Sequence, residues 1–427
     1  MKRTREFVAV ALALISGACA SCPPAASSPP PPAPVATTST APAATAGPET
    51  TATADQPAAA GKDVATVTLV NPLGETRARE TIALALADVA QSVPGLAADQ
   101  LFVVDAAGAP VLSQLVDMDG DRTPDEIVFQ VDLAANESQT VKLRIGERPT
   151  AVAADYQVYG RFIRERFDDF AWENDWGAYR MYGPALETAP NDSLTSSGID
   201  VWVKRVRRLV VNDWYMTDNY HQDHGEGLDA YKVGPSRGCG GVGIWTKGKL
   251  AVSKNFTTSR VLANGPIRLV FELSYDGWQA GPLWVSETKR VILDAGSLFN
   301  HFVSTVSGQG AMSFAIGIAK HPGGTVDFGG KAGWMRDWEP LNEGKDGGLG
   351  CAIVLPPGAT ASQEQTDGEY LLVTPAKGTT AVNYYVGTAW SRGGRVADSA
   401  GWQREVEHQS RRLATPVQVT LGAIPAG

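Results

Sequence analysis

Residues 219–241, NYHQDHGEGLDAYKVGPSRGCGG, bring together side chains that can exchange protons, bind anions or bind metals. Only two residues separate His221 from His224, and acidic, phenolic and cationic groups follow within the same segment: Glu226, Asp229, Tyr231, Lys232 and Arg237. The six glycines of the segment allow tight turns and a close approach of the backbone to a ligand. Core strands and core helices do not have this composition, so the segment is predicted to be a loop that carries a site.

Acid–base chemistry is the first interpretation of this loop, because imidazole titrates near neutrality and arginine can bind an anion through two parallel hydrogen bonds. The residues assigned to catalysis are two alternative bases, two alternative acids, an anion-binding arginine and an orienting glutamate: His221, His224, Tyr220, Tyr231, Arg237 and Glu226. The residues expected to bind substrate are Trp172, Glu173, Asp175, Asp229, Lys232, His321 and Tyr384. We expect the two histidines and the arginine to point into one concave pocket.

Two other interpretations of the loop stay open. His221 and His224, with Asp223 or Glu226, could bind Zn²⁺, which neutral imidazoles and carboxylates suit. The sequence does not identify the further ligand from elsewhere in the chain that a catalytic zinc would need. Alternatively the loop is structural, and its polar side chains cap its own backbone.

An earlier segment, residues 168–184, mixes acids with aromatic side chains. Glu173 and Asp175 could line a sugar site, with Trp172 as a stacking platform. The alternative is a strand whose aromatic residues belong to the core. His321 and Tyr384 lie at or near the ends of later apolar runs, where loops on one rim of a β-sandwich assemble sites.

A cluster of acids around a glycine, DMDGDRTPDE, occupies residues 117–126. Asp117, Asp119, Asp121 and Asp125 could wrap Ca²⁺, which prefers carboxylate and carbonyl oxygens. Their spacing is not that of an EF-hand. Asp and Gly are also the residues that favour hairpin turns, so a hydrophilic turn without a metal is the alternative.

The first 61 residues are predicted to contribute nothing to the fold. Residues 1–20 have a basic start and a short apolar run, as in an export signal. Cleavage after Ala20 and lipidation of Cys19 remain alternatives, and we favour the lipid anchor. Residues 21–61 are rich in Pro, Ala and Thr, which predicts a disordered tether. We therefore expect an exported protein, either periplasmic or anchored to the outer membrane.

The rest of the chain is predicted to be all-β. Short alternating runs indicate an N-terminal β-sandwich over residues 62–150 and a larger antiparallel β-sandwich over 151–427. Helical spacing is clear only in SAGWQREVEHQSRRLA, residues 399–414. The net charge of −9 argues against nucleic acid as a partner. Cys239 and Cys351 could pair in an oxidising compartment, but their separation in sequence does not decide this.

Several segments together resemble a bacterial family, the proteins with domain of unknown function 4861: FAWENDWGAYRMYGPAL, SSGIDVWVKR, YHQDHGEGLDAYKVGPSRGCGG, KNFTTSRVLANGPIRLVFEL and LDAGSLFNHFVST. The resemblance covers most of residues 62–427. It implies an exported protein of polysaccharide-degrading bacteria, built on a galactose-mutarotase-like supersandwich and associated with elimination chemistry on oligosaccharides.

The resemblance and the residues together favour a carbohydrate lyase or dehydratase acting by β-elimination on an oligosaccharide. Such a reaction needs a base, an acid and a group that stabilises the enolate-like intermediate. The alternatives are a sugar epimerase or glycoside hydrolase with paired carboxylates, drawn from Glu226, Asp229 and Glu173, and a glycan-binding module without catalysis. No cofactor is assigned with certainty beyond the Ca²⁺ and Zn²⁺ alternatives.

Overall fold

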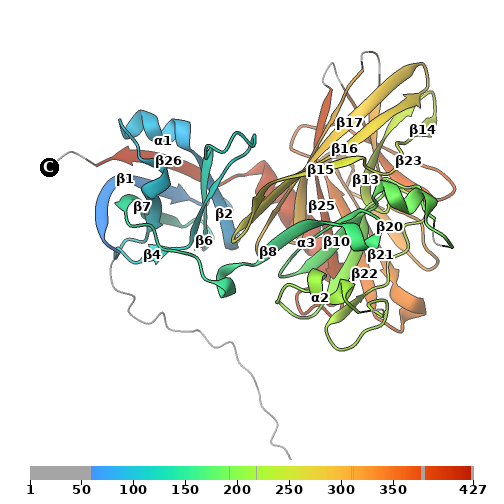
Figure 1. The fold of residues 1–427 in the computed structure, drawn as a ribbon, viewed down its shortest axis with the longest axis horizontal. Helices are drawn as coiled ribbons and strands as arrows, with labels where there is room; N and C mark the ends of the chain where they lie inside the picture. Colours follow the sequence, from blue (N-terminus) through green and yellow to red (C-terminus); the bar gives the residue numbers. More distant parts are fainter. Residues whose placement is uncertain are drawn as a thin grey trace, which may run out of the picture. The chain divides into compact units, whose positions relative to one another are not determined.

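The computed structural model describes residues 59–424, apart from 192, 218, 309, 311 and 377–379 (Figure 1). The predicted export signal, Cys19 and nearly all of the predicted tether therefore lie outside the described residues. The described residues all belong to one compact unit. Strands dominate it, which confirms the predicted all-β class. No helix in the described part of the chain has both the length and the apolar character needed to cross a membrane.

Two sheets form a small N-terminal sandwich (Figure 1). In β1, Ala65, Val67 and Leu69 are buried at every second position, as expected for a strand with one face on the core. The five-stranded sheet has the order β26 (Gln418–Ala423), β1 (Gly61–Val70), β7 (Ser138–Gly146), β3 (Leu101–Val104) and β4 (Pro110–Val111). The second sheet has the order β2 (Arg77–Ala85), β6 (Glu126–Leu133) and β5 (Ser113–Val116), and the helical elements are α1 (Leu86–Ser92) and η1 (Ala98–Gln100).

The last strand of the chain belongs to this small sandwich. β26 pairs antiparallel with β1, and Leu421 packs on the same core as Val67. Residues 418–423 therefore do not belong to the larger region predicted over 151–427. Alternation within a strand shows which face is buried, but it does not show which distant strand is its neighbour.

The larger sandwich has one eight-stranded sheet and two five-stranded sheets. The eight-stranded sheet has the order β15 (Thr258–Asn264), β16 (Arg268–Ala280), β17 (Leu283–Asp294), β18 (Phe299–Val306), β25 (Ala381–Trp390), β22 (Gly348–Val354), β21 (Trp334–Pro340) and β20 (Thr325–Phe328). One five-stranded sheet has the order β14 (Lys249–Ala251), β13 (Cys239–Thr246), β19 (Ser313–Ala319), β24 (Glu369–Pro375) and β23 (Ser362–Gln365). The other has the order β12 (Gly227–Asp229), β11 (Asp200–Lys204), β10 (Gly177–Met181), β9 (Asp169–Asn174) and β8 (Val158–Ile163). Their inner faces share one core, which includes Phe271, Ile316 and Trp172.

Helices are few and short in this larger region. They are α2 (Val211–Tyr215), α3 (Ser399–Ala414) and the 3₁₀ turns η2 (Ala153–Asp155), η3 (Arg164–Arg166), η4 (Pro184–Thr188), η5 (Gly330–Ala332) and η6 (Leu341–Gly344). The predicted helix over 399–414 is confirmed as α3. Asp398 caps it by accepting a 2.7 Å hydrogen bond from the Gly401 amide. Trp402 and Val406, four residues apart, bury one face of the helix.

Contacts along β16 join the small sandwich to the eight-stranded sheet. The side-chain oxygen of Gln114 in β5 accepts hydrogen bonds from the amides of Ile267 and Arg268, at 2.9 and 2.8 Å. Val128 of β6 and Val270 of β16 lie in one small apolar cluster beside these bonds. These buried contacts position the second sheet of the small sandwich against the outer face of the larger one.

Candidate functional site

Three aspartates surround one arginine on neighbouring strands of the β12–β8 sheet. Asp169 lies on β9, Arg180 on β10, Asp200 on β11 and Asp229 on β12. A guanidinium nitrogen of Arg180 lies 2.7 Å from Asp200 and 3.7 Å from Asp229, and its Nε lies 3.8 Å from Asp169. The three carboxylates are almost fully buried. One buried cation is therefore shared among three acids.

Strand register places these charges on one face of the sheet. Arg180 pairs with Asp200 across β10 and β11, and with Ala171, two residues after Asp169, across β9. Side chains two apart on a strand share a face, so all of these side chains point the same way. The opposite face, including Trp172, packs into the main core. The charged face is covered instead by α2 and the residues after it.

An aromatic layer covers the charges. The ring of Trp202 lies 5.8 Å from that of Trp214 and 5.1 Å from that of Tyr220, and the Arg180 guanidinium lies 5.9 Å from the Trp202 ring. Within the described residues, several buried polar atoms here have no hydrogen-bond partner: Arg166 Nε, Arg180 Nε, Trp202 Nε1, Tyr215 Oη and Tyr220 Oη. An unsatisfied buried polar atom costs about 1–3 kcal/mol, so this concentration is typical of a functional site rather than of a packed core.

Burial changes the protonation of the three acids. It raises the pKa of Asp169 to about 7, against the opposing effect of the Arg180 guanidinium. Burial, and then the neighbouring Asp200 carboxylate, raise the pKa of Asp229 well above its usual range. Burial also raises the pKa of Asp200, while Arg180 acts in the opposite direction. The cluster therefore holds protons at neutral pH, which is a common property of catalytic acids.

His221 connects this cluster to solvent. Its side chain is 52% exposed, and its Nδ1 lies 3.2 Å from the main-chain oxygen of Asp229 and 3.3 Å from the Asp229 carboxylate. Because Nδ1 faces two acceptors, the neutral ring carries its proton there and leaves the Nε2 lone pair free to accept a proton. Burial lowers the pKa of His221, so the ring is neutral at pH 7. His221 can therefore act as a general base.

The other polar residues of the loop stabilise its conformation. The Asp223 carboxylate accepts hydrogen bonds from the amides of Gly225 and Gly227 and forms an ion pair with Arg205. Glu226 forms a 2.6 Å ion pair with Arg208, whose hydrogen bond is the first cause of the lowered pKa of Glu226. These acids are held in charged pairs, so the loop is partly structural, as one interpretation expected.

The two histidines of the loop do not share a metal-ligand geometry. The Nε2 atom of the exposed His224 lies 3.2 Å from the main-chain oxygen of Asn219, whereas His221 faces Asp229. Across residues 59–424, leaving aside the undescribed positions, the grouping of three ligand side chains that could hold a metal is in the acidic turn and contains no histidine. The structure thus gives the zinc interpretation no third ligand.

His321 belongs to a second cluster. Its Nδ1 lies 2.5 Å from the Glu339 carboxylate, and its Nε2 lies 2.6 Å from the main-chain oxygen of Lys232. Burial lowers the pKa of His321, but the Glu339 carboxylate outweighs it and the net pKa is raised. Both ring nitrogens therefore donate, and the imidazolium joins the loop to β21. The ring of Tyr231 meets it edge-on at 5.0 Å, and the Lys232 side chain is exposed.

Two residues expected in an open pocket lie in the core instead. Arg237 is 1% exposed; it donates a 2.6 Å hydrogen bond to Ser197 and lies 3.9 Å from Glu369. It cannot bind an anion from solvent without losing these contacts, so the expected shared pocket with His221 and His224 is not formed. Tyr384 is fully buried, and its ring stacks on Phe302 at 5.2 Å.

The acid–aromatic segment is also built into the interior. The indole of the fully buried Trp172 donates a 2.8 Å hydrogen bond to Asn300, so no face of it is open to a sugar. Glu173 pairs with Lys204 at 2.7 Å and accepts hydrogen bonds from the amides at the start of α2. The Asp175 carboxylate lies 2.8 Å from Arg79. The alternative interpretation of a core strand holds for Trp172 and Glu173, and the structure corrects their expected sugar-contacting roles; Asp175 lies in the turn after β9.

Sequence reasoning missed the residues at the centre of the site, Asp169, Arg180, Asp200 and Tyr215. A usable signal was present, because GIDVWV and AYRMY each place one charge inside an otherwise apolar strand. Charged side chains are almost never fully buried unless they are paired. The missing information was the strand register that brings these isolated charges together.

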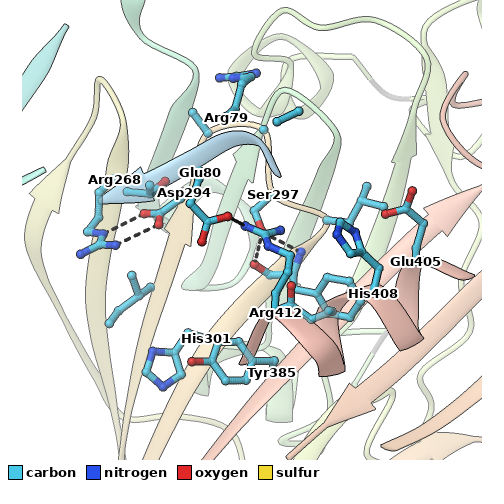
Figure 2. A pocket seen from close by; sticks show the side chains of 18 of the residues that line it. Arg79, Glu80, Arg268, Asp294, Ser297, His301, Tyr385, Glu405, His408 and Arg412 are labelled. Carbon is cyan, nitrogen blue, oxygen red and sulfur yellow. Dashed lines mark hydrogen bonds and ion pairs between the residues drawn. The ribbon is translucent and has the colours of Figure 1, made fainter. Parts of the chain in front are cut away.

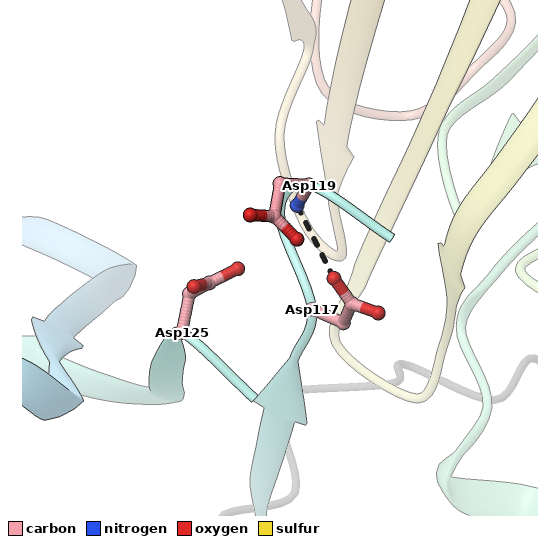
Figure 3. Close-up of side chains that lie close together, drawn as sticks. All are labelled: Asp117, Asp119 and Asp125. Carbon is pink, nitrogen blue, oxygen red and sulfur yellow. Dashed lines mark hydrogen bonds between the residues drawn. The ribbon is translucent and has the colours of Figure 1, made fainter. Parts of the chain in front are cut away.

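The acidic turn of the small sandwich brings together three of its four predicted ligands (Figure 3). The ligand oxygens of Asp117, Asp119 and Asp125 all lie within 4.8 Å of one another. The carboxylate of Asp121 instead accepts a 2.7 Å hydrogen bond from the amide of Thr123. Several of these oxygens already accept main-chain hydrogen bonds, as in a hydrophilic turn. Calcium binding remains a prediction.

Cys239 and Cys351 are both free and buried. Burial raises the pKa of each thiol, so neither is a ready nucleophile at neutral pH.

Comparison with known proteins gives a clear family match. A family model described as a domain of unknown function (DUF4861) matches residues 69–419. "Uncharacterized protein P7" of Formosa agariphila is 35% identical over 371 residues, which cover 83% of this chain and 93% of that protein.

Solved structures are similar only at a distance. A protein in the glycosyl hydrolase family 38 from Enterococcus faecalis matches with a TM-score of 0.48 and 9% identity. The match covers 84% of this chain and 47% of the Enterococcus faecalis chain. An alpha-mannosidase from Enterococcus faecalis has a TM-score of 0.41 and 9% identity, covering 85% and 46%. The chain therefore spans about half the length of these two proteins, and similarity at this level does not extend to function.

Proposed function

The chain belongs to the family with domain of unknown function DUF4861, and we propose that it is an exported carbohydrate-active enzyme that performs a β-elimination, of lyase or dehydratase type, on an oligosaccharide. The observation that supports this is the position of His221. Its imidazole is half-exposed and neutral, and it contacts Asp229, which belongs to a buried cluster of carboxyl groups with raised pKa values. Elimination begins with removal of a carbon-bound proton, and a neutral histidine is a suitable base.

Asp229 orients the base in either of its own protonation states. The main-chain oxygen of Asp229 accepts the Nδ1 proton of His221 at 3.2 Å, and this oxygen is present whether or not the carboxyl group is ionised. The Nε2 atom of His221 is then directed away from Asp229. In the proposed reaction, Nε2 removes the proton from the sugar carbon next to the electron-withdrawing group. The C–O bond to the leaving group on the neighbouring carbon then breaks.

Positive charge for the enolate-like intermediate comes from Arg166 and Lys232. Burial is the main cause of the lowered pKa of His221, and the Lys232 charge acts in the same direction; burial raises the pKa of Asp229, and the Lys232 charge opposes that rise. The Arg166 guanidinium lies 5.4 Å from the ring of Tyr220. Tyr220 is the phenol next to the base, with a ring distance of 4.4 Å to His221, and burial raises its pKa. It is therefore protonated at neutral pH and is our choice for the acid that protonates the leaving oxygen. Because its hydroxyl oxygen is buried, the covering side chains must move before this oxygen can reach the substrate.

The test is a product assay with the full-length protein on a panel of acidic and neutral oligosaccharides. Elimination gives an unsaturated product that absorbs in the near ultraviolet and, for dehydration, has lost one water by mass spectrometry. His221→Ala should lower kcat about 10²–10⁴-fold, as expected for removal of a general base. His224→Ala is the matched control, because it removes an exposed histidine of the same loop and should change kcat less than threefold. Equal activity in the two variants would refute the assignment.

A glycoside hydrolase with paired carboxylates is a second candidate, and the raised pKa of Asp169, about 7, favours it because hydrolysis needs a protonated acid at neutral pH. The acids first considered for this role are less suitable, since Glu226 and Glu173 are held in ion pairs with Arg208 and Lys204. A new reducing end without an unsaturated product would favour hydrolysis over elimination.

A further inference from the structure

A cavity of about 530 Å³ lies on the outer face of the eight-stranded sheet (Figure 2). His301 of β18 and Tyr385 of β25 form part of its lining, whereas their neighbours Phe302 and Tyr384 point to the opposite face and into the core. β2 of the small sandwich and α3 provide the other walls. The candidate base, His221, is not among the residues that line this cavity, so the two sites use different residues.

The charges in this cavity are already neutralised within the protein. Arg268 binds both oxygens of Asp294, at 2.8 and 2.9 Å, and also lies 3.1 Å from Glu126. Arg412 forms an ion pair with Glu80 (Figure 2). A carboxylate or sulfate group on a ligand would have to compete with these acids for the arginines. The cavity is therefore unsuited to selecting an anion by charge.

The polar groups of the cavity that lie outside its ion pairs are largely neutral. Burial lowers the pKa of His301, and burial followed by the Arg412 charge lowers the pKa of His408, so both imidazoles are neutral at pH 7. Within the described residues, His408 Nε2 has no hydrogen-bond partner; it lies 3.5 Å from a Glu75 oxygen, but without hydrogen-bond geometry. A neutral imidazole offers one donor and one acceptor, and the Tyr385 hydroxyl offers both.

The floor of the cavity adds an aromatic surface. The rings of His301 and Tyr385 lie 4.6 Å apart and within 14° of parallel, as a directly opposed pair across β18 and β25. The two rings stack on each other, which restricts both side chains and lowers the entropy lost when a ligand packs on them. An amphipathic surface of this kind suits a ligand with both apolar faces and hydroxyl groups.

We propose that this cavity is a binding site for a neutral oligosaccharide segment, with a sugar ring packed on the His301–Tyr385 pair. Sugar hydroxyls both donate and accept, which matches neutral imidazoles, a phenol and the outer atoms of arginine–carboxylate pairs. The volume falls within the roughly 300–1,000 Å³ of typical ligand pockets. The inference rests on the proposed function for the class of ligand, but it assigns a site outside the proposed catalytic residues, so the cavity would hold a substrate chain without reacting with it.

Calorimetric titration of the full-length protein tests this proposal. The probes are the neutral trisaccharides cellotriose, mannotriose and xylotriose, with trigalacturonate as the anionic comparison. At least one neutral probe should bind, and His301→Ala should weaken that binding about tenfold, because one well-packed aromatic contact contributes up to about that factor. His408→Gln is the second variant and should also weaken it, and melting curves show that each variant is folded.

Two control variants separate this proposal from the proposed function. Trp284→Ala removes an exposed aromatic residue, 67% exposed and outside the cavity, and should leave the affinity unchanged. His221→Ala should abolish turnover yet leave binding in the cavity unchanged. If no neutral probe binds, if trigalacturonate alone binds, or if both cavity variants bind as the wild type does, the proposal is wrong, whatever the product assay shows.

Discussion

Replacing Asp169 with asparagine should remove a defined part of the pH dependence of stability. Asparagine has the shape of a protonated aspartate and can still accept the 3.0 Å hydrogen bond from the Gly183 amide through its side-chain oxygen. Asp169 is 2% exposed, and burial raises its pKa from 3.8 to about 7. Because the folded pKa lies above the unfolded pKa, the folded state binds the proton more tightly than the unfolded state does.

The direction and size of the pH effect on the free energy of unfolding follow from this difference in pKa. Below pH 3.8 the carboxyl group is protonated in both states, so the free energy of unfolding does not change with pH there and the contribution of the bound proton is fully present. As the pH rises from about 4 to about 7, the stabilising contribution of the bound proton is lost. The difference of 3.2 pKa units, from 3.8 to about 7, corresponds to about 4 kcal/mol at 1.36 kcal/mol per unit. Asp169→Asn should therefore gain stability relative to the wild type over this range.

Urea denaturation of the two proteins from pH 4 to pH 8 measures this effect. The difference in free energy of unfolding, variant minus wild type, should rise with pH and level off above pH 7. Taking the difference removes the contribution of every group that both proteins share. Asp367→Asn, at an exposed position, is the control and should give a flat difference. A flat or falling difference for Asp169→Asn would show that Arg180 keeps this carboxylate ionised, against our reasoning.

Three further predictions concern other parts of the molecule. Because burial lowers the pKa of His221 below 6.5, the acid limb of kcat/KM should lie below that pH, as a pH–rate profile will show. Lys204→Met should destabilise the fold by about 3–5 kcal/mol in urea titrations, since it leaves the buried Glu173 without its cation, whereas the double variant with Glu173→Leu should recover part of the loss. Calcium chloride should raise the melting temperature, and Asp119→Asn should abolish the increase; an unchanged wild-type melting temperature would leave the acidic segment as a simple turn.

Local sequence patterns predicted the all-β class and the longest helix, but not the short elements α2 and β12. Alternating apolar residues such as Val67 and Leu69 identified β1, and the four-residue spacing of Trp402 and Val406 identified α3. Both signals arise from contacts within one element, so they can be read from a short window of sequence. The partner of β26 could not be found in this way, because its pairing with β1 joins residues more than 340 positions apart.

The site was predictable only in part for the same reason. The polarity and glycines of residues 219–241 predicted a loop, and the segment does carry the half-exposed His221, but it also contains the buried strand β12 and the start of β13. Arg237, in the same loop segment, was expected beside it but turns into the core. Composition shows that a segment is polar, but it does not show where each side chain points. In sequence, Asp200 and Arg180 are two separate charges inside apolar strands, and only the register shows that they face each other across β10 and β11.

Asp229 should tolerate replacement by asparagine better than a catalytic aspartate usually does. In a catalytic triad the aspartate must be ionised, and its change to asparagine lowers kcat about 10⁴-fold through the wrong histidine tautomer. Here burial and Asp200 raise the pKa of Asp229 well above its usual range, which favours the neutral carboxyl group. His221 is oriented by the main-chain oxygen of residue 229, which asparagine keeps. Asp229→Asn should therefore retain kcat within about tenfold, and a loss of several hundredfold would show that His221 depends on an ionised Asp229.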